Sequence, residues 1–251
     1  MTPRRIAEDV AFCLVFFTRL PLPHFEFGSR ALAQAIWAAP LVGVAVALAA
    51  SVAHLIASAA GLSPEVAAAL ALATAMLVTG CLHEDGLSDV ADGFGGGGTR
   101  ERKLEIMRDS RIGAYGASAL LMSALIRWSA IAQLGNPFSV FCGLVAAHAA
   151  SRALLPAFMH LVQPARPDGL AASAGTASAD AAYVSLAIGA VALLALGLSG
   201  LVAAGILLAL VFYGFRALCL RQVGGQTGDT LGALQQLGEI AVLLVAAAIL
   251  T

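Results

Sequence analysis

The sequence predicts an all-α membrane protein: a polytopic bundle of about seven transmembrane helices with an N-terminal amphipathic helix. Of the 251 residues, 60% are hydrophobic and only 12% are charged, and the mean hydropathy is +0.89. A soluble domain usually carries about 25% charged residues, so a water-soluble enzyme is excluded. The apolar runs are long, rich in Ala and Leu and without a period of two, which favours helices over strands.

Charge and cysteine usage exclude further classes of protein. The formal net charge of −1 offers no basic surface for phosphate backbones, so we expect no nucleic-acid partner. Disorder is excluded as well, because a disordered chain has low hydrophobicity together with high net charge. The four cysteines lie far apart in the sequence, which indicates neither a metal knuckle nor a redox pair.

Residues 1–30 are predicted to form an interfacial segment that begins with an amphipathic helix. Four apolar residues fall near one face at helical spacing: Ile6, Val10, Leu14 and Phe17. Such a helix lies on or dips into the membrane surface, and the Pro21-Leu22-Pro23 turn ends it. A first, poor transmembrane segment is the alternative.

Seven apolar runs are long enough to cross the hydrocarbon core, which takes about 20 helical residues. They lie within 31–60, 64–82, 114–134, 138–162, 181–198, 201–218 and 231–250. The connections alternate between almost uncharged and arginine-rich, and positive loops stay in the cytoplasm. We therefore expect one integral domain over 1–251 in the cytoplasmic (inner) membrane, with the N-terminus inside and the C-terminus outside.

Charged side chains are concentrated between His83 and Arg111. Asp85, Asp89 and Asp92 are spaced i, i+4 and i+7, which places them within roughly 60° of one another on a helix. Three such carboxylates repel one another unless a cation neutralises them, and hard oxygen ligands suit Mg²⁺ or Mn²⁺. The spacing predicts a metal site, and a solvated acidic helix end is the alternative.

Two groups flank this stripe. On an ideal helix His83 would point roughly opposite the carboxylates, as a general acid or base, a ligand or an interfacial histidine. A run of four glycines, 95–98, leads to Arg108-Asp109-Ser110-Arg111. The two arginines could hold a diphosphate through bidentate contacts, or they could form salt bridges with neighbouring acids.

A second polar cluster, Gly224 to Gly232, lies at the N-terminal end of the last predicted span. The alternation of charged loops places it on the same cytoplasmic face as the first cluster, so 83–113 and 221–232 are the candidate active-site segments. Asp229 or Thr230 could cap the helix, and a helix N-terminus also favours an anionic ligand. For Glu239, Arg127 and Arg152, buried ion pairing and catalysis are both open.

Three stretches of the chain together closely resemble the cobalamin synthase (adenosylcobinamide-GDP ribazoletransferase) family. They read HEDGLSDVADG at 83–93, LEIMRDSRIG at 104–113 and GGQTGDTLG at 224–232. FTRLPLP at 17–23 and Leu237-Gly238-Glu239 fit the family as well. The sequence departs from the family at Glu84, where the family usually has an apolar residue.

The resemblance implies transfer of the adenosylcobinamide phosphate moiety from adenosylcobinamide-GDP to α-ribazole or its 5′-phosphate, with release of GMP. Mg²⁺ is the implied cofactor, and the lipid bilayer is the implied surrounding. The implied metal ligands are Asp85, Asp89 and Asp92, and the implied catalytic residues are His83 and Asp229. The implied substrate-binding residues are Arg108, Asp109, Ser110, Arg111, Gln226, Thr227 and Thr230. The oligomeric state stays open.

Two other functions compete with this interpretation. A phospholipid-type phosphotransferase would act on a nucleotide-activated lipid, but the alanine-arginine step of that family's motif is absent. A transporter would place polar residues near mid-membrane in several helices, whereas here they collect at one face, and no inverted repeat is apparent.

Overall fold

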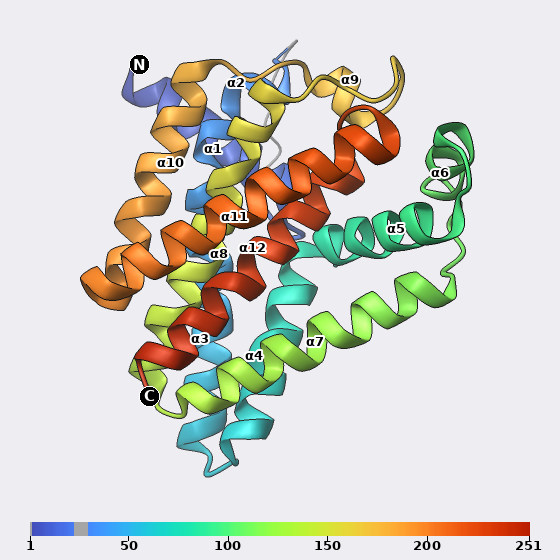
Figure 1. The fold of residues 1–251 in the computed structure, drawn as a ribbon. Coiled ribbons are helices and arrows are strands. Elements are labelled where there is room, and N and C mark those ends of the chain that lie inside the picture. The colour runs from blue at the N-terminus through green and yellow to red at the C-terminus, as the bar shows by residue number, and fades with distance from the viewer. Residues whose placement is uncertain (1, 23–29) are drawn as a thin grey trace.

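The computed structural model describes residues 2–22 and 30–251, and these residues form helices and connections without a β-strand (Figure 1). Residue 1 and residues 23–29 of the predicted interfacial segment 1–30 lie outside the described residues. The elements, in chain order, are α1 (Pro3–Phe17), α2 (Leu32–Ala35), η1 (Ile36–Ala38), α3 (Ala39–Ala59), α4 (Pro64–Thr79), α5 (Leu82–Gly96), α6 (Arg100–Ile106), α7 (Ala114–Leu134), α8 (Pro137–Leu161), α9 (Leu170–Ala174), α10 (Ala179–Leu193), η2 (Leu194–Leu196), α11 (Gly197–Val223) and α12 (Gly228–Ile249).

The prediction of a polytopic helix bundle is confirmed, while the number of seven spans is approximate. In the described residues five helical stretches are long and apolar enough to cross a membrane, or six if the bent pair α4–α5 counts as one. One of the five, 179–223, contains both α10 and α11, which meet at Gly197 with a φ of 73°. These two helices run in different directions in Figure 1, so they are two separate helices, as the predicted spans 181–198 and 201–218 require.

A sharp turn after α4 sends the acidic helix α5 away from its apolar predecessor. Gly80 and Cys81 both have left-handed backbone conformations, with φ of 62° and 57°, and α5 is bent by 89° from α4. A left-handed conformation is uncommon for a residue other than glycine. The amide of Arg19 donates to the carbonyl of Val78 at 2.7 Å, so the chain after α1 packs against this turn.

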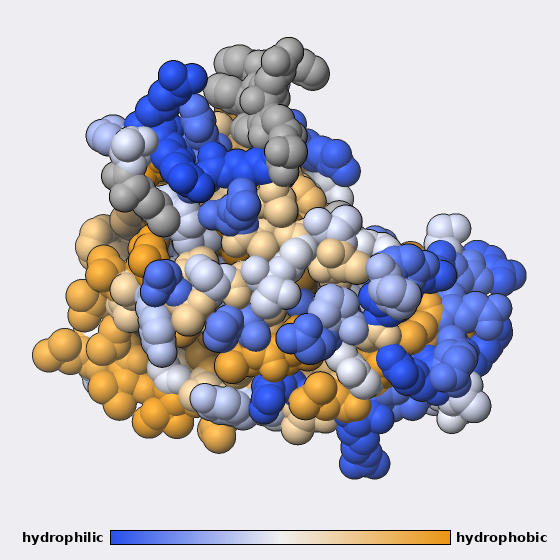
Figure 2. Space-filling view, turned by 90° about the horizontal axis from the view of Figure 1, so that it is seen from above, coloured by the Kyte–Doolittle hydropathy of each residue, from blue (hydrophilic) through white to orange (hydrophobic). Residues whose placement is uncertain are grey.

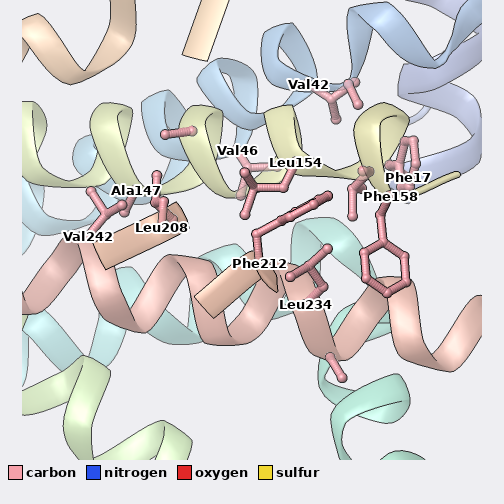
Figure 3. Close-up of a cluster of buried hydrophobic side chains, with 14 of the residues drawn as sticks. Phe17, Val42, Val46, Ala147, Leu154, Phe158, Leu208, Phe212, Leu234 and Val242 are labelled. Atoms are coloured by element: carbon pink, nitrogen blue, oxygen red, sulfur yellow. The ribbon is translucent and has the colours of Figure 1, made fainter. Parts of the chain in front are cut away.

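The core lies between α3, α8, α11 and α12, with Phe17 of α1 at one end (Figure 3). Helix α8 is at its centre, and its apolar residues from Leu144 to Phe158 are almost all buried. A side chain on Gly43 of α3 would come within 2.8 Å of the backbone nitrogen of Ala149, so only glycine permits this approach of α3 to α8. Small residues allow such close helix contacts in lipid.

Most of the apolar face predicted for helix α1 packs against the core. Phe17 is buried, and Val10 and Leu14 are half-buried against the core, whereas Ile6 is 39% exposed. The buried side also includes Asp9, which is tolerated there because the indole nitrogen of Trp37 donates to it at 2.9 Å and Arg30 pairs with it.

Polar and apolar surfaces are segregated. Seen from above in Figure 2, hydrophilic residues gather on the right-hand side, over α6, and hydrophobic residues gather on the left, where α10 and α11 project. Exposed Arg100, Glu101 and Arg102 belong to the hydrophilic side. Exposed leucines such as Leu198 and Leu210 of α11 belong to the apolar surface that a bilayer would cover.

Candidate functional site

A pocket of about 130 Å³ lies where the end of α1 meets the beginnings of α5 and α12, with α9 beside it. Its polar lining consists of His83 and Asp85 from α5, Asp229 from α12 and Arg166 from the connection between α8 and α9. Its apolar wall includes Phe16, Phe17, Ile36, Leu155 and Leu231. The structure therefore brings the two predicted segments, 83–113 and 221–232, to one pocket.

Two glycines allow α5 and α12 to touch at this pocket. A side chain on Gly86 would lie 2.8 Å from the backbone oxygen of Asp229, and one on Gly232 would lie 3.3 Å from the Cα of Gly86. The helix backbones are therefore in direct contact. This contact places Asp85 and Asp229, which are neighbours of the two glycines, beside the same pocket.

The threonines at the start of α12 cap the helix. The backbone nitrogen of Thr230 donates to Thr227 Oγ1 at 3.2 Å, and that of Thr227 donates to Thr230 Oγ1 at 2.8 Å, which is a capping box. The hydroxyl of Thr227 also donates to Asp229 Oδ2 at 3.1 Å and so orients that carboxylate. Both threonines are buried. They hold the start of the helix in place and do not line the pocket.

Gln226 is also buried, and its backbone joins two connections. Its nitrogen donates to the carbonyl of Gln163 at 2.9 Å, and its carbonyl accepts from the nitrogen of Ala165 at 2.7 Å. This short parallel pairing holds the connection that carries Arg166 against the beginning of α12. The Gln226 side chain does not line the pocket in the described residues.

The predicted aspartate stripe divides in the structure. Asp85 is exposed in the pocket and Asp89 is half-buried, and the charges of Asp229, Asp85 and Asp92 all act on Asp89. Asp92 is buried, and its two oxygens accept from the backbone nitrogens of Gly113 at 2.7 Å and Gly116 at 2.9 Å. It thereby satisfies free amides at the N-terminus of α7.

The metal-ligand role of Asp85, Asp89 and Asp92 stays a prediction. In the part of the chain that the structure describes, no group of three or more His, Cys, Asp or Glu side chains is arranged to hold a metal ion. The physical reason is that Asp92 binds the start of α7. Spacing along α5 alone does not report this partner, because it lies more than twenty residues further along the chain.

His83 is buried beside the pocket and stacks on Phe17, with ring centroids 5.8 Å apart and ring planes 17° apart. Its Nε2 atom has no hydrogen-bond partner among the described residues. A buried imidazole nitrogen without a partner is costly unless a ligand or water meets it. His83 thus lines the pocket, while its Nε2 atom is buried without a partner among the described residues.

The segment 108–111 lies outside the pocket lining, and its arginines form the salt bridges that the sequence left as an alternative. Arg108 Nη2 contacts Asp168 Oδ2 at 2.5 Å, and Arg111 Nη2 contacts Asp109 Oδ2 at 2.5 Å. The Arg111 guanidinium lowers the pKa of Asp109 to about 2 through hydrogen bonds, and Arg108 lowers the pKa of Asp168 in the same way. Ser110 lies exposed between them.

Arg166 is the pocket residue that sequence reasoning missed as a site residue. The sequence alone indicates only that Arg166 is a positive charge in a loop predicted to be cytoplasmic. Its position follows from tertiary contacts: Arg100 of α6 donates to the carbonyls of Ala165 at 2.6 Å and Val223 at 2.8 Å, which ties both connections together. No signal in the local sequence of Arg166 indicates this arrangement.

Buried ion pairing, one of the two interpretations left open for Glu239, Arg127 and Arg152, is confirmed for Arg127 and Glu239, whereas Arg152 forms no ion pair among the described residues. Arg127 Nη1 contacts Glu84 Oε1 at 2.9 Å and Glu239 Oε1 at 3.1 Å. His148 Nδ1 lies 3.0 Å from Glu239 Oε2, and Arg152 donates to the carbonyl of His148 at 3.1 Å. Pairing makes charges at this depth tolerable.

Fold and site together define a polytopic membrane protein with a carboxylate-rich pocket where two helix ends meet. More particularly, the chain belongs to the family described as CobS, cobalamin-5-phosphate synthase, whose model matches residues 9–247.

Curated relatives match over almost their whole length. A protein of Mesorhizobium japonicum is 60% identical over 251 residues, covering 100% of this chain and 97% of the relative. One of Bradyrhizobium diazoefficiens is 52% identical, covering 98% and 96%, and one of Azorhizobium caulinodans is 44% identical, covering 97% of each. All three are named adenosylcobinamide-GDP ribazoletransferase. No solved structure matches the chain.

Proposed function

We propose that this protein catalyses the transfer of the adenosylcobinamide phosphate moiety from adenosylcobinamide-GDP to α-ribazole or its 5′-phosphate, in cobalamin biosynthesis. The observation that carries the proposal is the meeting of Asp85 and Asp229, from two separate family motifs, in one pocket with Arg166 and His83. The family membership and the names of the relatives support the same activity.

The proposed reaction is a substitution at phosphorus. A ribazole hydroxyl oxygen bonds to the phosphorus on the corrinoid side, the bond from that phosphorus to the bridging oxygen breaks, and GMP leaves with the electron pair. The barrier of such a step depends mainly on positioning and on charge. Arg166 supplies positive charge to the phosphate oxygens. His83, which lines the pocket, is the group we assign to receive the hydroxyl proton.

Mg²⁺ belongs to the proposal, with a donor set that differs from the one the sequence predicts. Asp85 and Asp229, which line the pocket from α5 and α12, would hold it, with the negative charge of Asp89 close enough to feel both of them. Mg²⁺ is commonly held by one or two carboxylates together with substrate phosphates, so a complete cage of protein ligands is not required. When bound, the ion would neutralise negative charge on the diphosphate.

Pocket size and loop charge suggest how the substrate is placed. At about 130 Å³ the pocket is smaller than the ~300–1,000 Å³ of typical small-molecule sites. It would therefore receive the diphosphate end, with the bulky corrinoid outside. Because arginine-rich connections stay inside, we place the pocket at the cytoplasmic face of the inner membrane.

Release of GMP by the purified protein tests the function. The protein in lipid nanodiscs would be incubated with Mg²⁺, adenosylcobinamide-GDP and α-ribazole. Formation of GMP and a cobalamin in equal amounts is expected. Asp85→Asn and Asp89→Asn should abolish both products without loss of folding, while the matched control Asp180→Asn, an exposed carboxylate at the start of α10, should retain them.

The same assay separates the competing functions. GMP formation that requires a lipid alcohol instead of ribazole would favour a phospholipid-type enzyme. Absence of GMP with a folded protein would contradict the proposal and favour a transporter.

A further inference from the structure

A buried ion bridge joins the two helices that carry the pocket carboxylates. Arg127 of α7 is 1% exposed, and its Nη1 atom donates to Glu84 of α5 and to Glu239 of α12. Helix α7 contributes no side chain to the lining of the pocket in the described residues. Arg127 therefore touches both helices without touching the site.

Further bonds hold the same two glutamates in place. Gln236 of α12 donates to Glu84 Oε1 at 3.3 Å, the oxygen that also accepts from Arg127. The second oxygen of Glu239 accepts from Gln235 Nε2 at 2.6 Å and lies 3.0 Å from His148 Nδ1. Glu239 is thus held on both oxygens, and Glu84 is linked to α12 twice.

The bridge and the glycine contact hold α12 at two separate levels. Gly232 touches α5 beside the pocket, whereas Glu239 lies seven residues further along, about 10 Å at 1.5 Å per residue. Helix α12 also packs against α8, α11 and α7, and these two contacts add a defined register against α5. Two contacts at this separation resist both pivoting and sliding.

On the α5 side, the bridge acts directly beside the site. Glu84 immediately precedes Asp85 in the first turn of α5. A shift of the Glu84 backbone would therefore move the Asp85 carboxylate by a similar distance. Misplacement of a reacting group by about 1 Å can lower a rate about 100-fold.

We propose that Arg127 is a positioning residue: by binding Glu84 and Glu239 it sets the angle and register of α5 against α12 and so brings Asp85 and Asp229 to one pocket. This inference rests on the proposed function, because turnover is the quantity that the positioning serves. Arg127 itself makes no contact with the reacting groups.

The test removes the bridge without leaving an unpaired buried charge. Arg127→Met alone would strand two carboxylates, which destabilises a protein strongly. The double variant Glu84→Gln, Arg127→Met keeps the volumes and removes one charge of each sign, so that Glu239 still faces the buried Arg152. We expect it to fold, with kcat for GMP release lowered about 30-fold or more and KM changed less than about 3-fold.

Two further variants give the comparison its controls. A lysine ammonium is a single donor group with three protons, so Arg127→Lys should reach both glutamates and retain at least about a third of kcat. Gln133→Met removes a different bond between α7 and α12, from Gln133 Nε2 to the carbonyl of Ala247 at 3.2 Å. It should leave kcat within about two-fold of the unmodified protein.

Each outcome decides between distinct claims. A folded double variant with unchanged kcat would overturn the positioning role while the proposed function stands. Loss of thermal stability in parallel with activity in both the double variant and Arg127→Lys would show a merely structural role and would also overturn it. If the unmodified protein itself releases no GMP, the proposed function fails before any variant is compared.

Discussion

Asp85 and Asp229 line the same pocket although 144 positions separate them in the chain. Their meeting depends on the contact of Gly86 with the backbone of Asp229, and on the buried bridge from Arg127 to Glu84 and Glu239. Backbone contact and ion bridge together make one acidic site from two helix beginnings.

Asp229→Asn should lower GMP release about 100-fold or more, since it removes one negative charge from the proposed cation site. Thermal unfolding in detergent should change little, because asparagine keeps the oxygen that accepts from Thr227. Steady-state kinetics and a melting curve on the same preparation check both statements. Activity close to that of the unmodified protein would remove Asp229 from the site.

Asp92 should behave differently from Asp89, because it caps α7. Asp92→Ala is expected to destabilise the protein by about 0.5–2 kcal/mol, the usual cost of losing a helix cap, and to lower the melting temperature whether or not Mg²⁺ is present. Asp89→Asn should leave the melting temperature without Mg²⁺ unchanged and impair turnover. If Asp92→Ala lost Mg²⁺-dependent activity at full stability, Asp92 would be a ligand after all.

Gly86→Ala should separate α5 from α12, because the new Cβ would lie 2.8 Å from the backbone oxygen of Asp229. Overpacking of this kind costs about 1–3 kcal/mol, and turnover should fall with it. Gly214→Ala in α11 is the matched control, since nothing lies within 4 Å of its added Cβ. Equal melting temperatures and turnover for the two variants would contradict the close approach.

Arg166, and neither Arg108 nor Arg111, should determine the affinity for the diphosphate. Arg166→Met is expected to raise KM for adenosylcobinamide-GDP about 10-fold or more, the effect of losing a charged contact to phosphate. Arg108→Met and Arg111→Met remove only exposed salt bridges, which solvent screens, and should leave KM nearly unchanged. The reverse order of effects would return the diphosphate to the segment 108–111.

Protonation of Asp109 should not shape the pH profile of the enzyme. Its pKa of about 2 lies below the ordinary carboxyl value, so the pairing with Arg111 is complete above the ordinary value and is lost only as pH falls toward 2. Asp109→Asn should therefore leave the profile of GMP release between about pH 5 and 9 unchanged. A profile shifted by this substitution would show that Asp109 acts in the site.

The sequence predicts most of the fold class and part of the site. Long apolar runs indicate membrane helices whatever their packing, and the two polar motifs identify Asp85 and Asp229. Spacing along one helix does not reveal partners on another, which is why the contact of Asp92 with the N-terminus of α7 cannot be seen in the sequence. Arg166 escaped notice because only the pairing of its loop with Gln226 brings it to the pocket.

Binding of Mn²⁺, followed by electron paramagnetic resonance in the presence of GDP, tests the central claim most directly. We expect a bound-Mn²⁺ signal in the unmodified protein. Asp85→Asn and Asp229→Asn should each lower the Mn²⁺ affinity about 10-fold or more, whereas Asp180→Asn should leave it unchanged. Equal Mn²⁺ affinity in all four proteins would contradict a cation site shared by α5 and α12.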